Sequence, residues 1–354
     1  MYFIRTIAVT MLATVAGLSA HAAEIKGAGS SAAEPLYSAL ASAYASVGKV
    51  SLAYTASGSS DGIKQIKAKT VDFGATDVAM SAADRKAAKL VCIPTAISGV
   101  VPVVNLPGVR KGQLQLTGEV LADIFARKIV RWNDEKLKAL NHGMSLPDLP
   151  IAVVARSDGS GSTYNFSDYL SKVSPSWNTS FGHNFTIAWP TGTVAVKGSG
   201  GVVEALKKTP GAISYVDYQY ANLNNLSFAL LKNRDGRFAT PGASSFSAAL
   251  INSAWMSKGN FDEMLTDRPG SNSWPITSGS FILVPQVTDN PEKTIAAIKF
   301  VTWGFIHGDA MVGKADFVRL PDPVQGRIFV ELTSIVDASG APLKWSLADL
   351  LKAN

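Results

Sequence analysis

Residues 151–170, IAVVARSDGSGSTYNFSDYL, contain a strand, a loop and a helix in direct succession. The apolar run 151–155 is typical of a buried strand, and the residues from Tyr164 onward have a helical pattern. Between them lies a loop of glycine, serine and aspartate, 158–163, whose residue types favour turns and helix starts. A strand that leads into a helix through a short loop is the unit from which α/β proteins are built.

The same alternation continues on both sides of this stretch and predicts an α/β architecture. Predicted strands are 49–55, 91–97, 100–105, 151–155, 212–216 and 280–285. Predicted helices are 35–47, 62–69, 82–89, 119–125, 164–171 and 202–208. Ser81 with Asp84 predicts a capping box, and Thr117 and Asn290 are suited to cap later helices. Residues 345–351 predict a short amphipathic helix at best.

Residues 1–22 have the pattern of a secretory signal peptide. Arg5 supplies a positive charge, 6–19 is apolar, and Ala20-His21-Ala22 is a small-x-small cleavage pattern. A membrane anchor is the alternative, but the apolar run is shorter than the roughly 18 residues that a spanning helix needs. We therefore expect cleavage after Ala22 and an exported, soluble mature chain.

The composition indicates a two-domain globular protein. The chain has 354 residues, of which 47% are hydrophobic and 17% charged. Loss of Arg5 leaves 32 of the 33 Lys and Arg residues against 27 Asp and Glu, a net charge of +5 that can steer an anion but identifies none. The lysines are scattered, so we expect no nucleic-acid partner. Cys92, the only cysteine, lies in an apolar run and is expected to be a buried, inert thiol.

Three glycine- and serine-rich loops, 27–31, 57–62 and 158–163, each precede a predicted helix. Glycine lets the backbone turn tightly and lets a ligand approach the main chain. The first N–H groups of a helix point outward without partners and carry a partial positive charge, and serine hydroxyls add further donors. One such loop is ordinary helix-capping chemistry. Three in one chain favour a site for a small oxyanion without identifying which one.

Two charged residues narrow the choice of anion. Arg156 can grip an oxyanion bidentately while Asp158 holds the guanidinium in place, although a plain surface ion pair is the alternative. Asp77 ends an apolar stretch that we expect to lie near the second loop. An ionised carboxylate only accepts hydrogen bonds, so it favours phosphate, which keeps an O–H at neutral pH, over sulfate, which does not. A helix N-cap is the alternative role for Asp77.

The chain resembles the periplasmic phosphate-binding proteins of Pst-type ABC transporters. The resemblance includes Val71-Asp72-Phe73-Gly74-Ala75-Thr76-Asp77 and Asp158-Gly159-Ser160-Gly161. Further matching segments follow in order over the mature chain at 27–29, 35–37, 58–60, 62, 64–66, 99–101, 104–105, 123–125, 132–134, 151–154, 210–213, 215–216 and 274–277.

The resemblance implies the two-lobe, type II periplasmic-binding-protein fold, or Venus flytrap, with a mixed sheet in each lobe and two interlobe crossovers. We place the crossovers near 103–105 and 281–284. Residues 23–103 plus 283–354 then form lobe 1, and residues 104–282 form lobe 2. A ligand that bridges the two lobes would favour the closed state.

The resemblance also implies the residues that bind phosphate. The family pattern departs at Ser31-Ala32, where Thr-Phe is frequent, and at Ser162, where threonine is common. The first change keeps the backbone N–H but loses an aromatic wall, and the second keeps the hydroxyl. The implied phosphate-binding residues are Ser31, Ala32, Ser59, Asp77, Arg156, Ser160, Gly161 and Ser162.

The function implied is that of an exported, periplasmic solute-binding protein. It would capture inorganic phosphate and deliver it to the permease subunits of an inner-membrane ABC importer, which work with ATPase subunits. We expect a monomer that is not an enzyme, without catalytic residues, metal or other cofactor.

Three alternatives stay open. The chain could bind another oxyanion, such as sulfate, molybdate or a phosphonate. It could be a secreted serine hydrolase, because Gly58-Ser59-Ser60-Asp61-Gly62 matches G-x-S-x-G, although His142, His183 and His307 lack an obvious acidic partner. It could also have a structural or adhesive role, which would not need Arg156.

Overall fold

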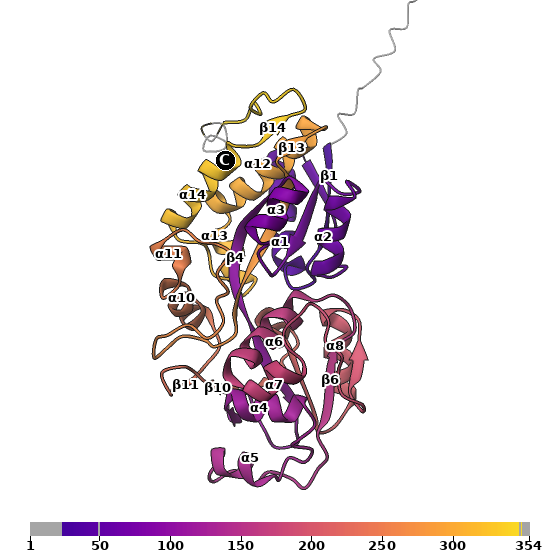
Figure 1. The fold of residues 1–354 in the computed structure, drawn as a ribbon, viewed down its shortest axis with the longest axis vertical. Coiled ribbons are helices and arrows are strands. Elements are labelled where there is room, and N and C mark those ends of the chain that lie inside the picture. The colour runs from indigo at the N-terminus through magenta and orange to yellow at the C-terminus, as the bar shows by residue number, and fades with distance from the viewer. Residues whose placement is uncertain (1–22, 49, 347, 349–354) are drawn as a thin grey trace, which may run out of the picture.

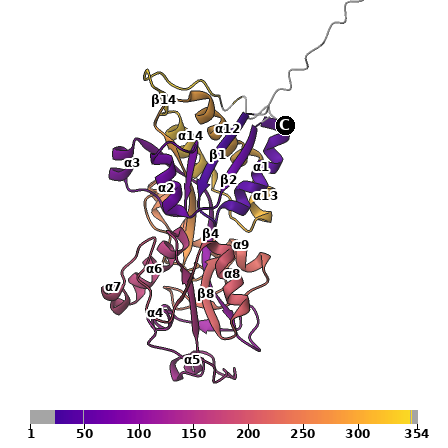
Figure 2. The ribbon, with the colours of Figure 1, turned by 90° about the vertical axis from the view of Figure 1, so that its right-hand side faces the viewer.

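A 16-residue strand, β4 (Leu90–Asn105), runs through both halves of the molecule (Figures 1 and 2). The computed structural model describes residues 23–48, 50–346 and 348, so the predicted signal peptide lies outside the described residues. Every residue of β4 except the last is buried. Its β-branched residues suit a strand that is covered on both faces.

β4 changes partner between Gly99 and Val100. Leu90–Gly99 pairs antiparallel with β12 (Thr277–Pro285), and Val100–Asn105 pairs antiparallel with β8 (Ala212–Asp217). The sequence predicted two strands here, and they form one. Gly99 permits this because a Cβ there would come within 2.4 Å of the Phe246 ring, so the strand and the ring pack closely.

The half of the sheet that contains β12 is mixed. Its strand order is β2 (Val50–Thr55), β1 (Ala23–Gly29), β3 (Phe73–Thr76), β12 and β4. β1 is parallel to β2 and β3, and β12 is antiparallel to β3 and β4. The helices α1 (Glu34–Gly48), α2 (Ser59–Lys67) and α12 (Pro291–His307) belong to this half (Figure 1).

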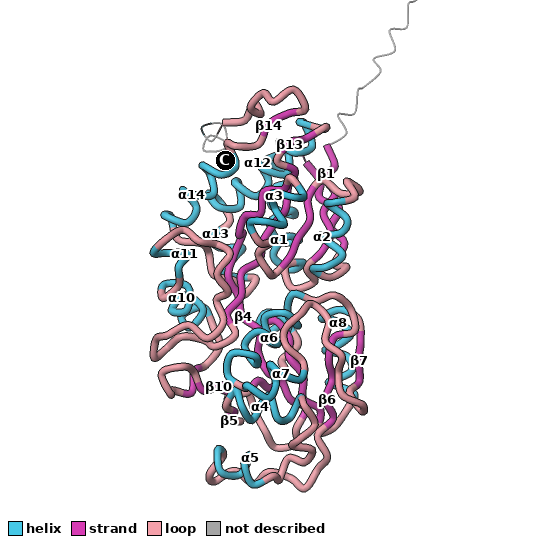
Figure 3. Tube along the Cα trace, viewed as in Figure 1, coloured by secondary structure: helices cyan, strands magenta, loops and turns pink. Residues whose placement is uncertain are grey.

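The other half of the sheet is also mixed. β8 is followed by β6 (Ala152–Arg156) and β7 (Val194–Val196), which run parallel to one another. The helices α6 (Gly161–Val173) and α8 (Gly198–Lys208) lie here, and Figure 3 shows helices around the strands of both halves. The chain therefore has the predicted α/β architecture, with a mixed sheet in each half.

The remaining elements complete the two halves. They are α3 (Ala82–Ala88), β5 (Gln115–Leu116), α4 (Gly118–Phe125), α5 (Glu135–Leu140), α7 (Pro175–Ser180), α9 (Tyr218–Leu223), β9 (Ser227–Phe228), β10 (Leu230–Lys232), β11 (Phe238–Ala239), α10 (Ala243–Ile251), α11 (Ala254–Ser257), β13 (Val287–Thr288), α13 (Asp309–Lys314), α14 (Asp322–Leu332) and β14 (Val336–Asp337). Within the described ranges, no helix is both long and apolar enough to cross a membrane.

The predicted strands and helices each overlap an observed element, and the three predicted caps are confirmed. The side chains of Ser81, Thr117 and Asn290 each accept a bond from a backbone N–H in the first turn of α3, α4 and α12. Part of the predicted helix at 345–351 lies outside the described residues. The lobe boundaries stay a prediction, and the partner change at Gly99 lies close to the crossover expected near 103–105.

Candidate anion-binding site

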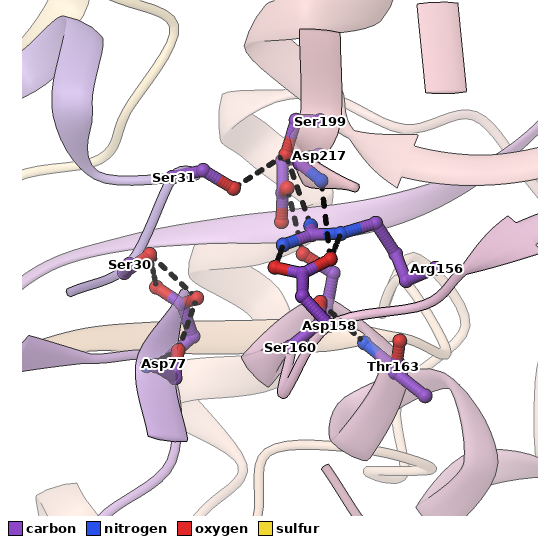
Figure 4. A network of polar contacts seen from close by, with 12 residues as sticks. Ser30, Ser31, Asp77, Arg156, Asp158, Ser160, Thr163, Ser199 and Asp217 are labelled. Carbon is purple, nitrogen blue, oxygen red and sulfur yellow. Dashed lines mark hydrogen bonds and ion pairs between the residues drawn. The ribbon is translucent and has the colours of Figure 1, made fainter. Parts of the chain in front are cut away.

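The three glycine- and serine-rich loops converge where the two halves meet. Figure 4 shows labelled residues of the first and third loops close together, and backbone bonds from Gly58 to Gly29 and from Ser60 to Gly159 bring the second loop to the same place. The first loop begins inside β1, because residues 27–29 are the end of that strand. The second leads into α2, and the third joins β6 to α6. The structure buries all eight residues predicted for the site and brings them to this one region. They are Ser31, Ala32, Ser59, Asp77, Arg156, Ser160, Gly161 and Ser162.

Asp77 is 4% exposed and is surrounded by serine hydroxyls. Ser30 Oγ donates to both carboxylate oxygens, at 2.7 and 2.6 Å, and Ser59 Oγ donates to Oδ2 at 3.2 Å. Burial, together with the charge of Asp217, raises the pKa of Asp77 to about 7 in spite of these bonds. The bonds from Ser30 and Ser59 make Asp77 a hydrogen-bond acceptor inside the site. Asp77 is not a helix cap, because Ser81 caps the next helix, α3.

Arg156 approaches from the other half and is 3% exposed. Its Nε and one terminal nitrogen donate to the two oxygens of Asp158, at 2.7 and 2.6 Å, and its other terminal nitrogen donates to Ser199 Oγ at 3.2 Å. Burial raises the pKa of Asp158, but the bonds from Arg156 outweigh it and hold that pKa below its usual range. The alternative of a plain surface ion pair is excluded, because this pair is buried.

Aromatic residues of α6 and β8 hold the third loop in place. Phe166 stacks on Tyr215 with ring centroids 4.3 Å apart, and Tyr215 Oη lies 2.7 Å from Thr163 Oγ1. Ser160 accepts the Thr163 N–H at 3.2 Å and so caps α6. The cap aligns the first N–H groups of α6 toward the site, where an anion is favoured.

Hydrogen bonds join the two halves directly around the site. The Ser60 N–H donates to the Gly159 carbonyl at 3.0 Å, and Asn165 Nδ2 donates to the Asp77 carbonyl at 2.9 Å. Gln219 donates to the Ala32 carbonyl at 2.5 Å. The loops from opposite halves are thus in contact, which is a closed arrangement.

An opening lies beside the second and third loops. A hollow of about 360 Å³ there is lined by Asp61, Lys64, Asp158 and Lys197, among others. The two lysines come from opposite halves and can draw an anion toward the cleft. A larger, mostly apolar pocket of about 660 Å³ lies between α1, α9 and α13 and holds none of the eight predicted site residues.

Comparison with known proteins assigns the family. A profile described as a PBP superfamily domain matches residues 14–305. The chain is 41% identical over 341 residues to the phosphate-binding protein PstS of Pasteurella multocida, covering 96% of this chain and 99% of the relative. The chain belongs to the PstS family of phosphate-binding proteins.

A second PstS relative agrees with this family assignment, and a solved structure agrees with the fold. The PstS protein of Haemophilus influenzae is 41% identical over 309 residues, covering 87% of this chain and 92% of that protein. The solved structure of a phosphate-binding protein from Stenotrophomonas maltophilia superposes with a TM-score of 0.65 at 18% identity, covering 87% of this chain and 94% of that one. The structural likeness supports the fold.

The sequence analysis of this PstS-family chain missed several site residues. Ser199 bridges the halves, with its Oγ 2.9 Å from Ser31 Oγ, and Asp217 accepts a bond of 2.8 Å from Ser162. Ser30 and Ser280 both donate to Asp77. Ser199 could have been found, because 198–201 is a fourth glycine- and serine-rich stretch at a helix start.

Among the residues that the structure describes in this PstS-family chain, no serine hydrolase site is assembled. A nucleophile at Ser60 would need a histidine as its base. His183 packs on Tyr164 and His307 on Trp303, and His142 is exposed in a turn after α5. Within the described part of the chain, no group of three or more His, Cys, Asp or Glu side chains could hold a metal ion.

Proposed function

We propose that this chain captures inorganic phosphate between its two lobes and passes it to an ABC-type importer. The observation that carries the proposal is that one closed site contains both a buried acceptor, Asp77, and a buried guanidinium, Arg156. Membership of the PstS family supports the same ligand.

Asp77 supplies the selectivity in this proposal. Phosphate retains at least one O–H at neutral pH, and this O–H donates to the carboxylate. Sulfate has none, so when Asp77 is ionised, above its pKa of about 7, sulfate binding would leave two buried oxyanions facing each other without a proton between them. An unsatisfied buried charged group costs about 3 kcal/mol or more, which is over 100-fold in affinity. The alternative ligands sulfate, molybdate and phosphonate are disfavoured to the extent that they carry no O–H to donate to Asp77.

The other predicted residues act as donors. Ser31, the Ala32 N–H and Ser59 contribute from lobe 1, with the Ser59 hydroxyl turning its proton from Asp77 to the ligand, and Arg156 contributes from lobe 2. The N-terminus of α6, with Ser160, Gly161 and Ser162, completes the set from lobe 2. Lobe 1 consists of 23–103 plus 283–354 and lobe 2 of 104–282, so phosphate touches both and stabilises the closed state.

The proposal includes an exported protein that is a monomer and not an enzyme. Cleavage of residues 1–22 would release it into the periplasm, where the permease subunits of the importer, with their ATPase subunits, receive the ligand. An adhesive or structural role is the less favoured alternative, because it gives no reason to bury Arg156 among serines.

Equilibrium dialysis of residues 23–354 with radiolabelled phosphate tests the site. We expect one phosphate per chain, with loss of binding in Arg156→Ala and weakened, less selective binding in Asp77→Asn. Arg131→Ala is the control, because Arg131 pairs with Asp148 on the surface and should bind like the parent chain. Unchanged binding in both site variants would refute these roles.

A further inference from the structure

Asp217 is a second buried carboxylate in the candidate site. It ends β8, is 2% exposed, and precedes α9 without capping it through its side chain. Ser162 Oγ from α6 donates to its Oδ2 at 2.8 Å, and in Figure 4 it lies beside Ser199 and Arg156. Neither the loop pattern nor the predicted site residues include it.

The negative charges of the carboxylates around Asp217 outnumber the positive charges. Arg156 faces it from β6, but both carboxylate oxygens of Asp158 already pair with that guanidinium. Asp77 follows β3 and lies within electrostatic reach, because the charge of Asp217 is one reason for the raised pKa of Asp77. Tyr220, on α9, is neutral, since burial raises its pKa. One buried cation thus stands against three carboxylates.

An arriving phosphate makes this imbalance worse. A dianion would add two negative charges to a site that carries a net charge of about −2 when Asp77, Asp158 and Asp217 are all ionised. Burying such a set without protons is strongly unfavourable, so protons accompany the anion. If Asp77 and Asp217 each accept one hydrogen bond from the ligand, two O–H groups must be shared among the ligand and these two carboxylates.

We propose that Asp217 is a second proton acceptor of the site, so that phosphate is bound with two protons shared among the ligand, Asp77 and Asp217. The inference rests on the proposed function and goes beyond it, because it fixes the protonation of the bound anion. Above neutrality free phosphate is mainly the dianion with one proton. Binding then takes up a further proton, and affinity for total phosphate falls as pH rises.

Titration calorimetry of phosphate-free protein at pH 8.5, in buffers of different ionisation enthalpy, counts these protons. We expect uptake of about one proton per phosphate in the parent chain and about zero in Asp217→Asn. Ser162→Ala removes the bond to Asp217 but keeps the carboxylate, so it should retain the uptake. Asp168→Asn is the matched control, because Asp168 is also buried but pairs with Lys172 away from the loops.

The outcomes separate the two proposals. Binding of phosphate without proton uptake by the parent chain overturns the inference and leaves the proposed function standing. Equal uptake in the parent chain and in a folded Asp217→Asn assigns the proton elsewhere and also overturns it. If that variant does not fold, Asp217→Ser replaces it, and equal uptake in the parent chain and in Asp217→Ser overturns the inference. Absence of phosphate binding overturns both proposals.

Discussion

Gly161 lies so close to Asp77, across the meeting point of the two halves, that a Cβ on Gly161 would come within 2.6 Å of Asp77 Oδ2. The same Cβ would lie 2.5 Å from Ser59 Oγ. The φ angle of Gly161 is not positive, so alanine fits the helix itself. The restriction to glycine therefore comes from the closed arrangement.

Gly161→Ala is expected to weaken phosphate binding roughly 10- to 100-fold, since overpacking costs about 1–3 kcal/mol. Melting of the ligand-free chain should change little, because the variant can relieve the clash by opening. Gly200→Ala is the control, because a Cβ there meets nothing within 4 Å. Equal phosphate affinity in both variants would show that Gly161 does not approach Asp77 when ligand binds.

Ser199→Ala tests the fourth glycine- and serine-rich stretch. Its hydroxyl contacts Ser31 and Arg156 at 2.9 and 3.2 Å. Its loss removes about 1–2 kcal/mol of hydrogen bonding, so we expect phosphate dissociation constants to rise about 5- to 30-fold.

Ser171→Ala is the matched control for Ser199→Ala. The Ser171 hydroxyl is buried without a hydrogen-bond partner in the described structure, so its removal should leave phosphate binding unchanged and stability equal or slightly higher. Parent-like phosphate affinity in Ser199→Ala, measured by tryptophan fluorescence, would count against a role for this stretch.

The elements with strong patterns were predictable from sequence, and the close approaches were not. β6 and α6 follow from an apolar run and a capped helix start, and Asp77 and Arg156 follow from residue type and resemblance. β1 and β3 were missed because their glycines and alanines resemble a loop. Their strand form depends on pairing with each other in the fold. Gly29 of β1 pairs with Ala75 of β3 so closely that a Cβ on Gly29 would come 2.0 Å from the Ala75 carbonyl oxygen.

Asp217 could not have been found by pattern either. Its neighbours Tyr215 and Val216 are buried strand residues, and the sequence contains no local signal that the next side chain bonds to Ser162 and lies near Arg156 (Figure 4). That meeting depends on β8 and α6, which are far apart in the chain and become adjacent only in the fold.

Asp77→Asn is expected to stabilise the ligand-free chain at pH 8. The folded-state pKa of Asp77 is about 7 against an ordinary value of 3.8, so the folded state binds more protons than the unfolded state between these values. Stability therefore falls as pH rises through this window. Asparagine removes that loss, which is on the order of 3 kcal/mol between pH 5 and pH 8. Urea unfolding at pH 5 and pH 8 measures it, and an equal pH dependence in both chains would contradict a raised pKa.

Calorimetric titration of phosphate-free residues 23–354 with phosphate and with sulfate, at equal ionic strength and pH 8.5, where Asp77 is ionised, tests whether the cleft selects an oxyanion that carries a proton. We expect a single site for phosphate with micromolar or tighter affinity, and no measurable heat of binding for sulfate. Equal affinity for the two anions, or no binding of phosphate, would contradict this expectation.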